Sequence, residues 1–195
     1  MTTPRIVLAS TSRYRAELLR RLLDDFEQIA PYVDEQPLPG EAPAARAARL
    51  AAAKAAAVSG QHHDAVVIGS DQVAALGDAI LHKPGSSDKA HEQLHASSGN
   101  IVHFHTGLCV LDGRRRGRLR SHIDHTRVVF RTLADEEIRR YVVRERPFDC
   151  AGSFKSEGAG IALFERIESE DPTALIGLPL IALARLLRET GIPVP

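Results

Sequence analysis

The segment Ser10–Ser12 and the two arginines that follow it could bind a phosphate group. The segment comes after the apolar run 5–9, which predicts a strand, and before a helical pattern for which Ser12 would be the N-cap. Free N–H groups at the start of a helix attract anions, and Arg13 and Arg15 add positive charge at the same place. Because the helix dipole favours acidic residues in a first turn, two arginines there indicate an anion. The alternative is a capped helix with two solvated arginines.

A carboxylate and an amide lie near the end of the apolar run 65–75, in the sequence Gly69-Ser70-Asp71-Gln72. The run is rich in small and β-branched residues, which predicts a strand in the middle of a sheet. A buried carboxylate is costly unless it pairs with a cation or transfers a proton. Successive strand residues point to opposite faces, so Asp71 and Gln72 can share a site only through a bulge or twist. The alternative is an aspartate that ends the strand and bonds a nearby loop.

Lys54 lies within the alanine-rich stretch 44–58, which predicts a helix. Its neighbours four residues away in either direction, Leu50 and Val58, are the large apolar residues of that stretch, so all three share the inward face. A lysine in that position needs a carboxylate or a phosphate. The alternative is a side chain that extends along the helix to reach solvent.

Two further motifs could complete a site for a polyphosphate. In the first, Glu35 comes directly after Asp34 and follows a short strand-like stretch. In the second, Lys83 is followed by Pro84. Carboxylates such as Glu35 and Asp71 can hold a divalent cation and a water, while lysines neutralise phosphate oxygens. The nine histidines and two cysteines lack the spacing of a zinc site, and the arginines at 114–116 and 118 are expected to form a solvated loop.

The elements that must position these residues alternate between helices and strands. Two long antiparallel strands are expected at 100–111 and 119–130, with further helices at 88–96, 132–143 and 179–189. Because a long hairpin cannot belong to a purely parallel sheet, the fold class is α/β with a mixed sheet.

Length, charge and hydropathy limit the class of protein. The chain has 195 residues, with 25 basic and 25 acidic side chains, and this balance argues against a nucleic-acid partner. No apolar run reaches the roughly 18 residues of a membrane span, and the start is too short in apolar residues for a signal peptide. We therefore expect one cytoplasmic domain over residues 1–195, with no membrane partner.

Taken in order, these motifs resemble the Maf family of nucleoside triphosphate pyrophosphatases over nearly the whole chain. The run Leu8–Ser12 with Arg15 is similar to the opening signature of the family, although Arg13 replaces its proline and Ala16 its second arginine. The motifs around Glu35, Lys54, Asp71 and Lys83 follow in the family's order. The stretches 150–158 and 177–180 resemble a subfamily associated with hydrolysis of N7-methyl-GTP, whereas its relatives act on dTTP and UTP.

The resemblance implies a Maf/ITPase-like fold, an elongated mixed sheet flanked by helices with a central cleft. It also implies attack of water on the α-phosphate of a nucleotide, with release of pyrophosphate and with Mg²⁺ or Mn²⁺ as cofactor. Asp71 would accept the proton, Glu35 would bind the metal together with Asp71, and cations would neutralise the phosphates. The catalytic residues expected are Asp71, Glu35, Lys54 and Lys83, and the substrate-binding residues are Ser10, Ser12, Arg13, Tyr14, Arg15, Gln72, Lys155 and Glu157.

Three of these residues would select the base. N7-methylguanine carries a positive ring charge that an aromatic face such as Tyr14 attracts, and Glu157 could accept from the two adjacent donors of guanine. Gln72 would bind the remaining polar edge. The alternatives are a Tyr14 that packs on the core and a solvated Glu157.

The partner expected is therefore a small nucleotide, and the family also implies a possible homodimer. Two other functions stay open at this point. One is a dTTP or UTP pyrophosphatase of the same family, and the other is a nucleotide-sensing regulator of cell division without turnover.

Overall fold

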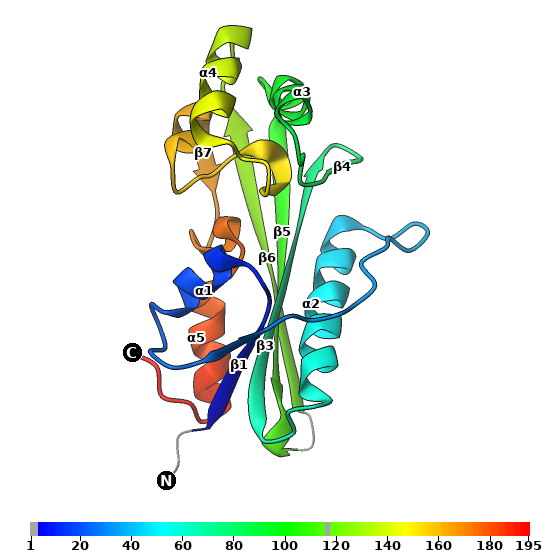
Figure 1. Ribbon diagram of the computed structural model, residues 1–195, viewed down its shortest axis with the longest axis vertical. Helices are drawn as coiled ribbons and strands as arrows, with labels where there is room; N and C mark the ends of the chain where they lie inside the picture. The colour runs from blue at the N-terminus through cyan, green and yellow to red at the C-terminus, as the bar shows by residue number, and fades with distance from the viewer. Residues whose placement is uncertain (1–3, 116–117) are drawn as a thin grey trace. The chain divides into compact units, whose positions relative to one another are not determined.

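The computed structural model describes residues 4–115 and 118–195, which form a mixed α/β fold (Figure 1). The strands are β1 (Arg5–Ala9), β2 (Glu27–Ile29), β3 (Ala65–Leu76), β4 (Ala79–Leu81), β5 (Ile101–Asp112), β6 (Arg118–Phe130) and β7 (Phe164–Glu168). The helices are α1 (Arg13–Leu19), α2 (Pro43–Ser59), α3 (Ser87–Ser97), α4 (Asp135–Glu145) and α5 (Leu180–Glu189). The expected fold class is confirmed.

The strands form one mixed sheet in the order β2-β1-β3-β5-β6-β7, with β4 paired to β3. β1 lies parallel to β2 and to β3, with Val7 opposite Glu27 and Val67. β4 is antiparallel to β3, and β7 is antiparallel to β6. The parallel part therefore lies around β1, where the turn after that strand carries the candidate phosphate-binding residues.

The chain folds into two compact units. The first contains residues 1–72, 106–124 and 171–195, and the second contains residues 73–105 and 125–170. The strands β3, β5 and β6 each contribute residues to both units. The single domain and the central cleft expected from the sequence stay predictions.

In the first unit, alternate residues of the strands build two separate cores on the two faces of the sheet. Ile6 and Leu8 of β1 belong to a core with α1 and α5, whereas Val7 and Ala9 belong to a core with α2. Figure 1 shows α2 on one side of these strands and α1 with α5 on the other. Successive side chains of β1 point to opposite faces of the sheet, so they pack alternately against α2 and against α1 with α5.

Helix α2 lies unusually close to the sheet because two strand residues are glycines. A Cβ atom at Gly69 would lie 2.2 Å from the carbonyl oxygen of Ala51, and one at Gly107 would lie 2.3 Å from that of Ala47. Larger residues at either strand position would push the helix away. The alanine-rich face of α2 and these two glycines let the helix pack directly on the sheet. Other side chains on that face of the helix therefore lie against the strands.

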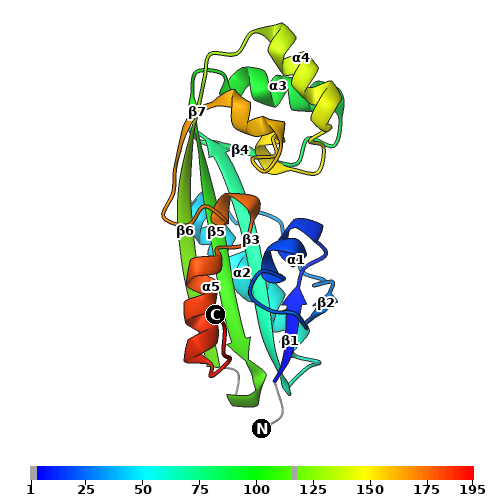
Figure 2. The same ribbon diagram turned by 90° about the vertical axis from the view of Figure 1, so that its left-hand side faces the viewer.

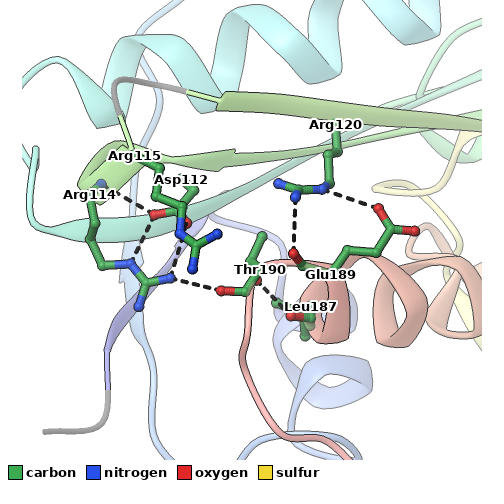
Figure 3. Close-up of polar contacts among 7 residues, drawn as sticks. All are labelled: Asp112, Arg114, Arg115, Arg120, Leu187, Glu189 and Thr190. Carbon is green, nitrogen blue, oxygen red and sulfur yellow. Dashed lines mark hydrogen bonds and ion pairs between the residues drawn. The ribbon is translucent and has the colours of Figure 1, made fainter. Parts of the chain in front are cut away.

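At the far end of the hairpin, Asp112 is fully buried and bound by Arg114 (Figure 3). Arg114 Nε and Nη2 donate to the two carboxylate oxygens at 2.9 and 3.0 Å, and Nη2 also donates to the carbonyl oxygen of Thr190 at 3.1 Å. Arg120 donates to the side chain and the backbone of Glu189. Arginines 114–116 and 118 were expected to form a solvated loop, and this expectation missed the bonds of Arg114 to Asp112 and Thr190; Arg116 lies outside the described residues.

In the second unit, α3 and α4 lie side by side (Figure 2). α3 contacts α4 and the 3-10 turn η2 (Ala151–Ser153), and α4 contacts the 3-10 helix η3 (Ala159–Leu163). Phe104, Phe130, Phe154 and Phe164 meet edge to face, with ring centroids 4.7 to 5.7 Å apart. Among the residues that the structure describes, no helix is long and apolar enough to cross a membrane.

Candidate active site

Two carboxylates meet one lysine in the first unit. Lys54 Nζ lies 2.6 Å from Asp71 Oδ1 and 2.6 Å from Glu35 Oε1. Lys54 is 7% exposed and Asp71 is 8% exposed, whereas the Glu35 side chain is 57% exposed. A buried ammonium group needs such partners, because an uncompensated charge in that position is costly.

The neighbours of Lys54 explain why it faces the sheet. Leu50 and Val58, on the same face of α2, are 2% and 4% exposed, so the inward-facing lysine expected from the sequence is confirmed. Asp71 lies two residues after Gly69 on β3 and therefore points to the same side of the sheet as that glycine, toward α2. Of the two partners expected for Lys54, a carboxylate and a phosphate, the structure provides carboxylates.

The Ser10–Ser12 turn is held by its own hydroxyl groups. Ser10 Oγ accepts from the backbone N–H of Ser12 at 3.1 Å and from Arg15 Nη1 at 3.4 Å. Ser12 Oγ accepts from the backbone N–H of Arg15 at 3.4 Å, which confirms Ser12 as the N-cap of α1. α1 has only seven residues and ends at Leu19, so the attraction for an anion depends mainly on the arginines rather than on a helix dipole.

Arg15 joins this turn to the segment before α5. Its Nε donates at 2.9 Å to the carbonyl oxygen of Gly177, which also accepts from Ser70 Oγ at 2.9 Å. Burial lowers the pKa of the Arg15 guanidinium, while the charges of Asp71 and Glu35 act in the opposite direction. No role for Ser70 could be predicted from the sequence, because its partners are backbone carbonyl groups, which residue types do not reveal.

Gln72 does not reach the Lys54 cluster. Its Nε2 lies within hydrogen-bonding distance of Thr106 Oγ1 at 3.1 Å and of the carbonyl oxygens of Ala174 and Leu175 at 2.9 and 3.0 Å. Gln72 thus links β3 to β5 and to the 3-10 turn η4 (Ala174–Ile176), on the face opposite Asp71. Asp71 and Gln72 therefore bind different partners, and contact of Gln72 with a base stays a prediction.

The ring of Tyr14 already has a cation on one face. Arg13 Cζ lies 4.7 Å from the ring centroid, and Arg13 Nη2 donates to the Tyr14 hydroxyl at 2.7 Å. Tyr14 is half-buried and Arg13 is exposed. The Tyr14 ring thus attracts a positive charge, and its contact with a methylated base stays a prediction.

The remaining expected site residues belong to the second unit. Lys83 is exposed, and its segment is held by bonds from Gln93 Nε2 to the carbonyl oxygen of His82 and from the Gly85 N–H to that of Phe148. Fixing the backbone on both sides limits where the lysine can reach.

The loop after α4 carries Lys155 and Glu157, the other two expected site residues of the second unit. Lys155 Nζ donates at 2.6 Å to the carbonyl oxygen of Glu145, the last residue of α4. Glu157 is exposed beside Ser156. Roles for Lys83, Lys155 and Glu157 in substrate binding stay predictions.

The donor set at Lys54 fits a magnesium or manganese ion. Mg²⁺ in proteins is commonly held by one or two carboxylates, and substrate phosphates and waters fill its other positions. Glu35 and Asp71 supply two carboxylates that already converge on one point. The described residues contain no group of three or more acidic, histidine or cysteine side chains placed for a metal, and the cation stays a prediction.

Comparison with known proteins gives the family. A model described as "Maf-like protein" matches residues 5–190, which is most of the chain. The chain belongs to the Maf family. A Maf relative in Cupriavidus pinatubonensis, named 7-methyl-GTP pyrophosphatase, is 53% identical over 190 residues, covering 97% of this chain and 95% of that protein. One of the same name in Xanthomonas axonopodis pv. citri is 54% identical over 192 residues, covering 98% of this chain and all of that protein.

Solved structures support the fold of this Maf chain. The Ham1 protein of Staphylococcus aureus superimposes with a TM-score of 0.53 at 13% identity, covering 95% of this chain and 99% of that one. A HAM1 protein from Coxiella burnetii gives 0.52 at 15% identity, covering 96% and 100%. At these identities the likeness concerns the fold alone, and it confirms the fold that the Maf signature implies.

Proposed function

We propose that this Maf protein is a nucleoside triphosphate pyrophosphatase that converts N7-methyl-GTP and water to N7-methyl-GMP and pyrophosphate. The observation that carries the proposal is the contact of Glu35 and Asp71 with the single ammonium group of Lys54. The choice of nucleotide is supported by the two relatives named 7-methyl-GTP pyrophosphatase, each more than half identical to this chain.

The reaction needs a base for water and positive charge for the leaving group. The water oxygen attacks the α-phosphorus, the bond from that atom to the bridging oxygen breaks, and pyrophosphate leaves. Asp71 would accept the proton that the water loses. Lys54, which donates to Asp71 Oδ1, would orient the carboxylate and place positive charge beside the negative charge that develops on the phosphate.

Phosphate binding would fall to the cations and to the turn after β1. Arg15 is anchored through Nε to Gly177, and this leaves a fixed, planar donor group beside Ser10. Arg13 and Lys83 are exposed and would add charge, and the Ser10–Ser12 turn would offer N–H groups. Fixed donors of this kind favour phosphoryl transfer because they need no rearrangement during the reaction.

A divalent cation, Mg²⁺ or Mn²⁺, belongs to the proposal, with Glu35 and Asp71 as its protein ligands. When bound, it would neutralise phosphate oxygens. Glu35 is the more exposed of the two acids and can therefore turn its oxygens toward a cation that arrives with the nucleotide. Tyr14 and Glu157 would select the methylated guanine, with Gln72 and Lys155 as further contacts.

A pyrophosphate-release assay on a panel of nucleotides tests this function. N7-methyl-GTP, GTP, dTTP and UTP would be compared at equal concentration, with Mg²⁺ and with EDTA. We expect the highest kcat/KM for N7-methyl-GTP and loss of turnover with EDTA. Faster hydrolysis of dTTP or UTP would assign a sibling activity, and nucleotide binding without release of pyrophosphate would favour a sensing protein.

We also propose a cytoplasmic location and a homodimer for this enzyme. Light scattering on the purified protein measures the mass in solution, and a monomer would contradict the second proposal.

A further inference from the structure

The segment that carries Glu35 is bound to α2 by two arginines of that helix. Arg46 Nη2 donates to the carbonyl oxygen of Glu35 at 2.9 Å, and Arg49 Nη2 donates to the carbonyl oxygen of Gln36 at 3.1 Å. Both bonds end on the backbone, so they fix the path of the chain at Glu35. Lys54, farther along the same helix, then contacts the Glu35 carboxylate.

Glu41, at the other end of the same segment, also binds Arg49 of α2. Its Oε1 and Oε2 accept from Arg49 Nε and Nη2 at 2.5 and 2.7 Å, and Oε2 also accepts from the N–H of Leu38 at 3.2 Å. Such two-pronged pairs of arginine and carboxylate are strong and directional. The Glu41 side chain is only 7% exposed. The hydrogen bond from Arg49 lowers the pKa of Glu41 to about 2, so the pair stays ionised at any pH used for assays.

The segment that carries Glu35 has no regular secondary structure to fix its path. Residues 30–39 form neither helix nor strand, and the Glu35 side chain is more than half exposed. Ordering a segment of this kind costs conformational entropy at every residue. The bonds from Arg46 and Arg49 order the segment before a nucleotide binds.

We infer that Arg49 and Glu41 are positioning residues for the reaction. Together with the Gln36 carbonyl group they form a clasp that holds residues 35–41 on α2 and keeps the Glu35 carboxylate beside Lys54 and Asp71. The clasp touches none of the reacting atoms and acts through Glu35. This inference rests on the proposed role of Glu35 in the pyrophosphatase.

Arg49→Met tests the clasp, because methionine keeps an unbranched apolar stem of similar shape and removes the donors. We expect kcat/KM for N7-methyl-GTP to fall about tenfold. We also expect the Kd for Mn²⁺, measured by calorimetry with a non-hydrolysable nucleotide analogue, to rise by a similar factor. Cleavage after Glu35 or Glu41 by a Glu-specific protease should become faster, as followed by mass spectrometry. Arg49→Lys keeps the charge but not the two-pronged geometry, and it should lie between Arg49→Met and the unmutated protein.

Arg5→Met is the matched control. Arg5 makes an equally two-pronged pair with Glu27, at 2.6 and 2.7 Å, between β1 and β2. This variant should leave kcat/KM, Mn²⁺ affinity and cleavage after Glu35 unchanged. An equal loss of activity in both variants would overturn the inference, because loss of any surface pair would then have the same effect.

A double-mutant cycle with Glu35→Gln separates positioning from general stability. If Arg49 acts through Glu35, adding Arg49→Met to Glu35→Gln should lower kcat/KM by less than about twofold. A further tenfold loss in that background would overturn the inference. Should the unmutated protein hydrolyse no nucleotide of the panel, the proposed function fails, whereas protease cleavage and Mn²⁺ affinity still decide on the clasp. Unchanged cleavage and unchanged affinity in Arg49→Met would then refute it.

Discussion

Lys54 Nζ lies 2.6 Å from Asp71 Oδ1, and this contact joins the middle of α2 to the strand β3. The side chains can meet because Gly69, two residues before Asp71, has no Cβ atom to keep the helix away. The close approach of helix and strand thus serves the same acid that the proposed mechanism uses as its base. Substitution of Asp71 should therefore lower turnover, whereas substitution of Gly69 should lower the stability of the fold.

Asp71→Asn should remove most of the turnover while nucleotide binding persists. The amide has nearly the same shape as the carboxylate and can still meet Lys54 through its oxygen, but it cannot accept a proton from water. We expect kcat to fall by about 10²- to 10⁴-fold, the usual contribution of a general base. Pyrophosphate release measures kcat, and calorimetry measures nucleotide binding. Asp78→Asn, at the exposed turn before β4, is the control; near-normal turnover by Asp71→Asn would show that another group is the base.

Gly69→Ala should destabilise the protein strongly. The new Cβ would lie 2.2 Å from the Ala51 carbonyl oxygen and 2.8 Å from the Ala55 nitrogen, both of them backbone atoms. α2 would have to move, at a cost of about 3 kcal/mol, typical of overpacking in a core. Gly60→Ala is the control, because its Cβ would come no closer than 3.6 Å to its neighbours. Urea unfolding of both variants measures the difference, and equal stabilities would contradict the close packing of α2.

The parts of the site that were predictable from sequence lie on regular elements. The burial of Lys54 followed from the helical spacing of Leu50 and Val58, and the divergence of Asp71 and Gln72 followed from strand alternation. Both periods are properties of the backbone and need no tertiary information.

The parts that were not predictable depend on tertiary contacts. Leu18, Leu19, Leu22 and Leu23 have helical spacing, but α1 ends at Leu19, and Leu22 and Leu23 pack on the core from outside the helix. The contact of Glu35 with Lys54 joins an irregular segment to a helix, and no periodicity predicts where such a segment lies. The sequence predicted that both residues belong to the site, but not that their side chains touch.

Base selection can be tested with a pair of variants. Tyr14→Ala removes a ring that already attracts the guanidinium of Arg13, so it should raise KM for N7-methyl-GTP about tenfold, or about 1.4 kcal/mol. Its effect on GTP, which lacks the ring charge, should be smaller. Glu157→Ala should raise KM for both nucleotides alike, because both keep the donor edge of guanine. Steady-state kinetics on the two nucleotides decide, and equal losses on both for Tyr14→Ala would exclude a cation–π contribution.

The buried Asp112 should make the stability of the first unit depend on pH in acid. Burial by itself would raise the pKa of this carboxyl group, but the hydrogen bonds and the charge of Arg114 outweigh it, and the pKa lies below its usual value. The folded protein therefore binds fewer protons than the unfolded chain below about pH 4, the usual value of aspartate. The Asp112 contribution to the free energy of unfolding is present above that pH and is lost as the pH falls through the lowered pKa.

Asp112→Asn tests whether the Asp112 carboxyl group, drawn in Figure 3, makes the stability depend on pH. At pH 7 the variant should lose about 3 kcal/mol, because it leaves Arg114 without its buried carboxylate. Between about pH 5 and pH 2 its free energy of unfolding should fall less steeply than that of the unmutated protein, since the group that titrates is gone. Urea unfolding at a series of pH values measures both slopes, with exposed Asp78→Asn as the control. Parallel slopes for Asp112→Asn and the unmutated protein would mean that Arg114 does not lower the pKa of Asp112.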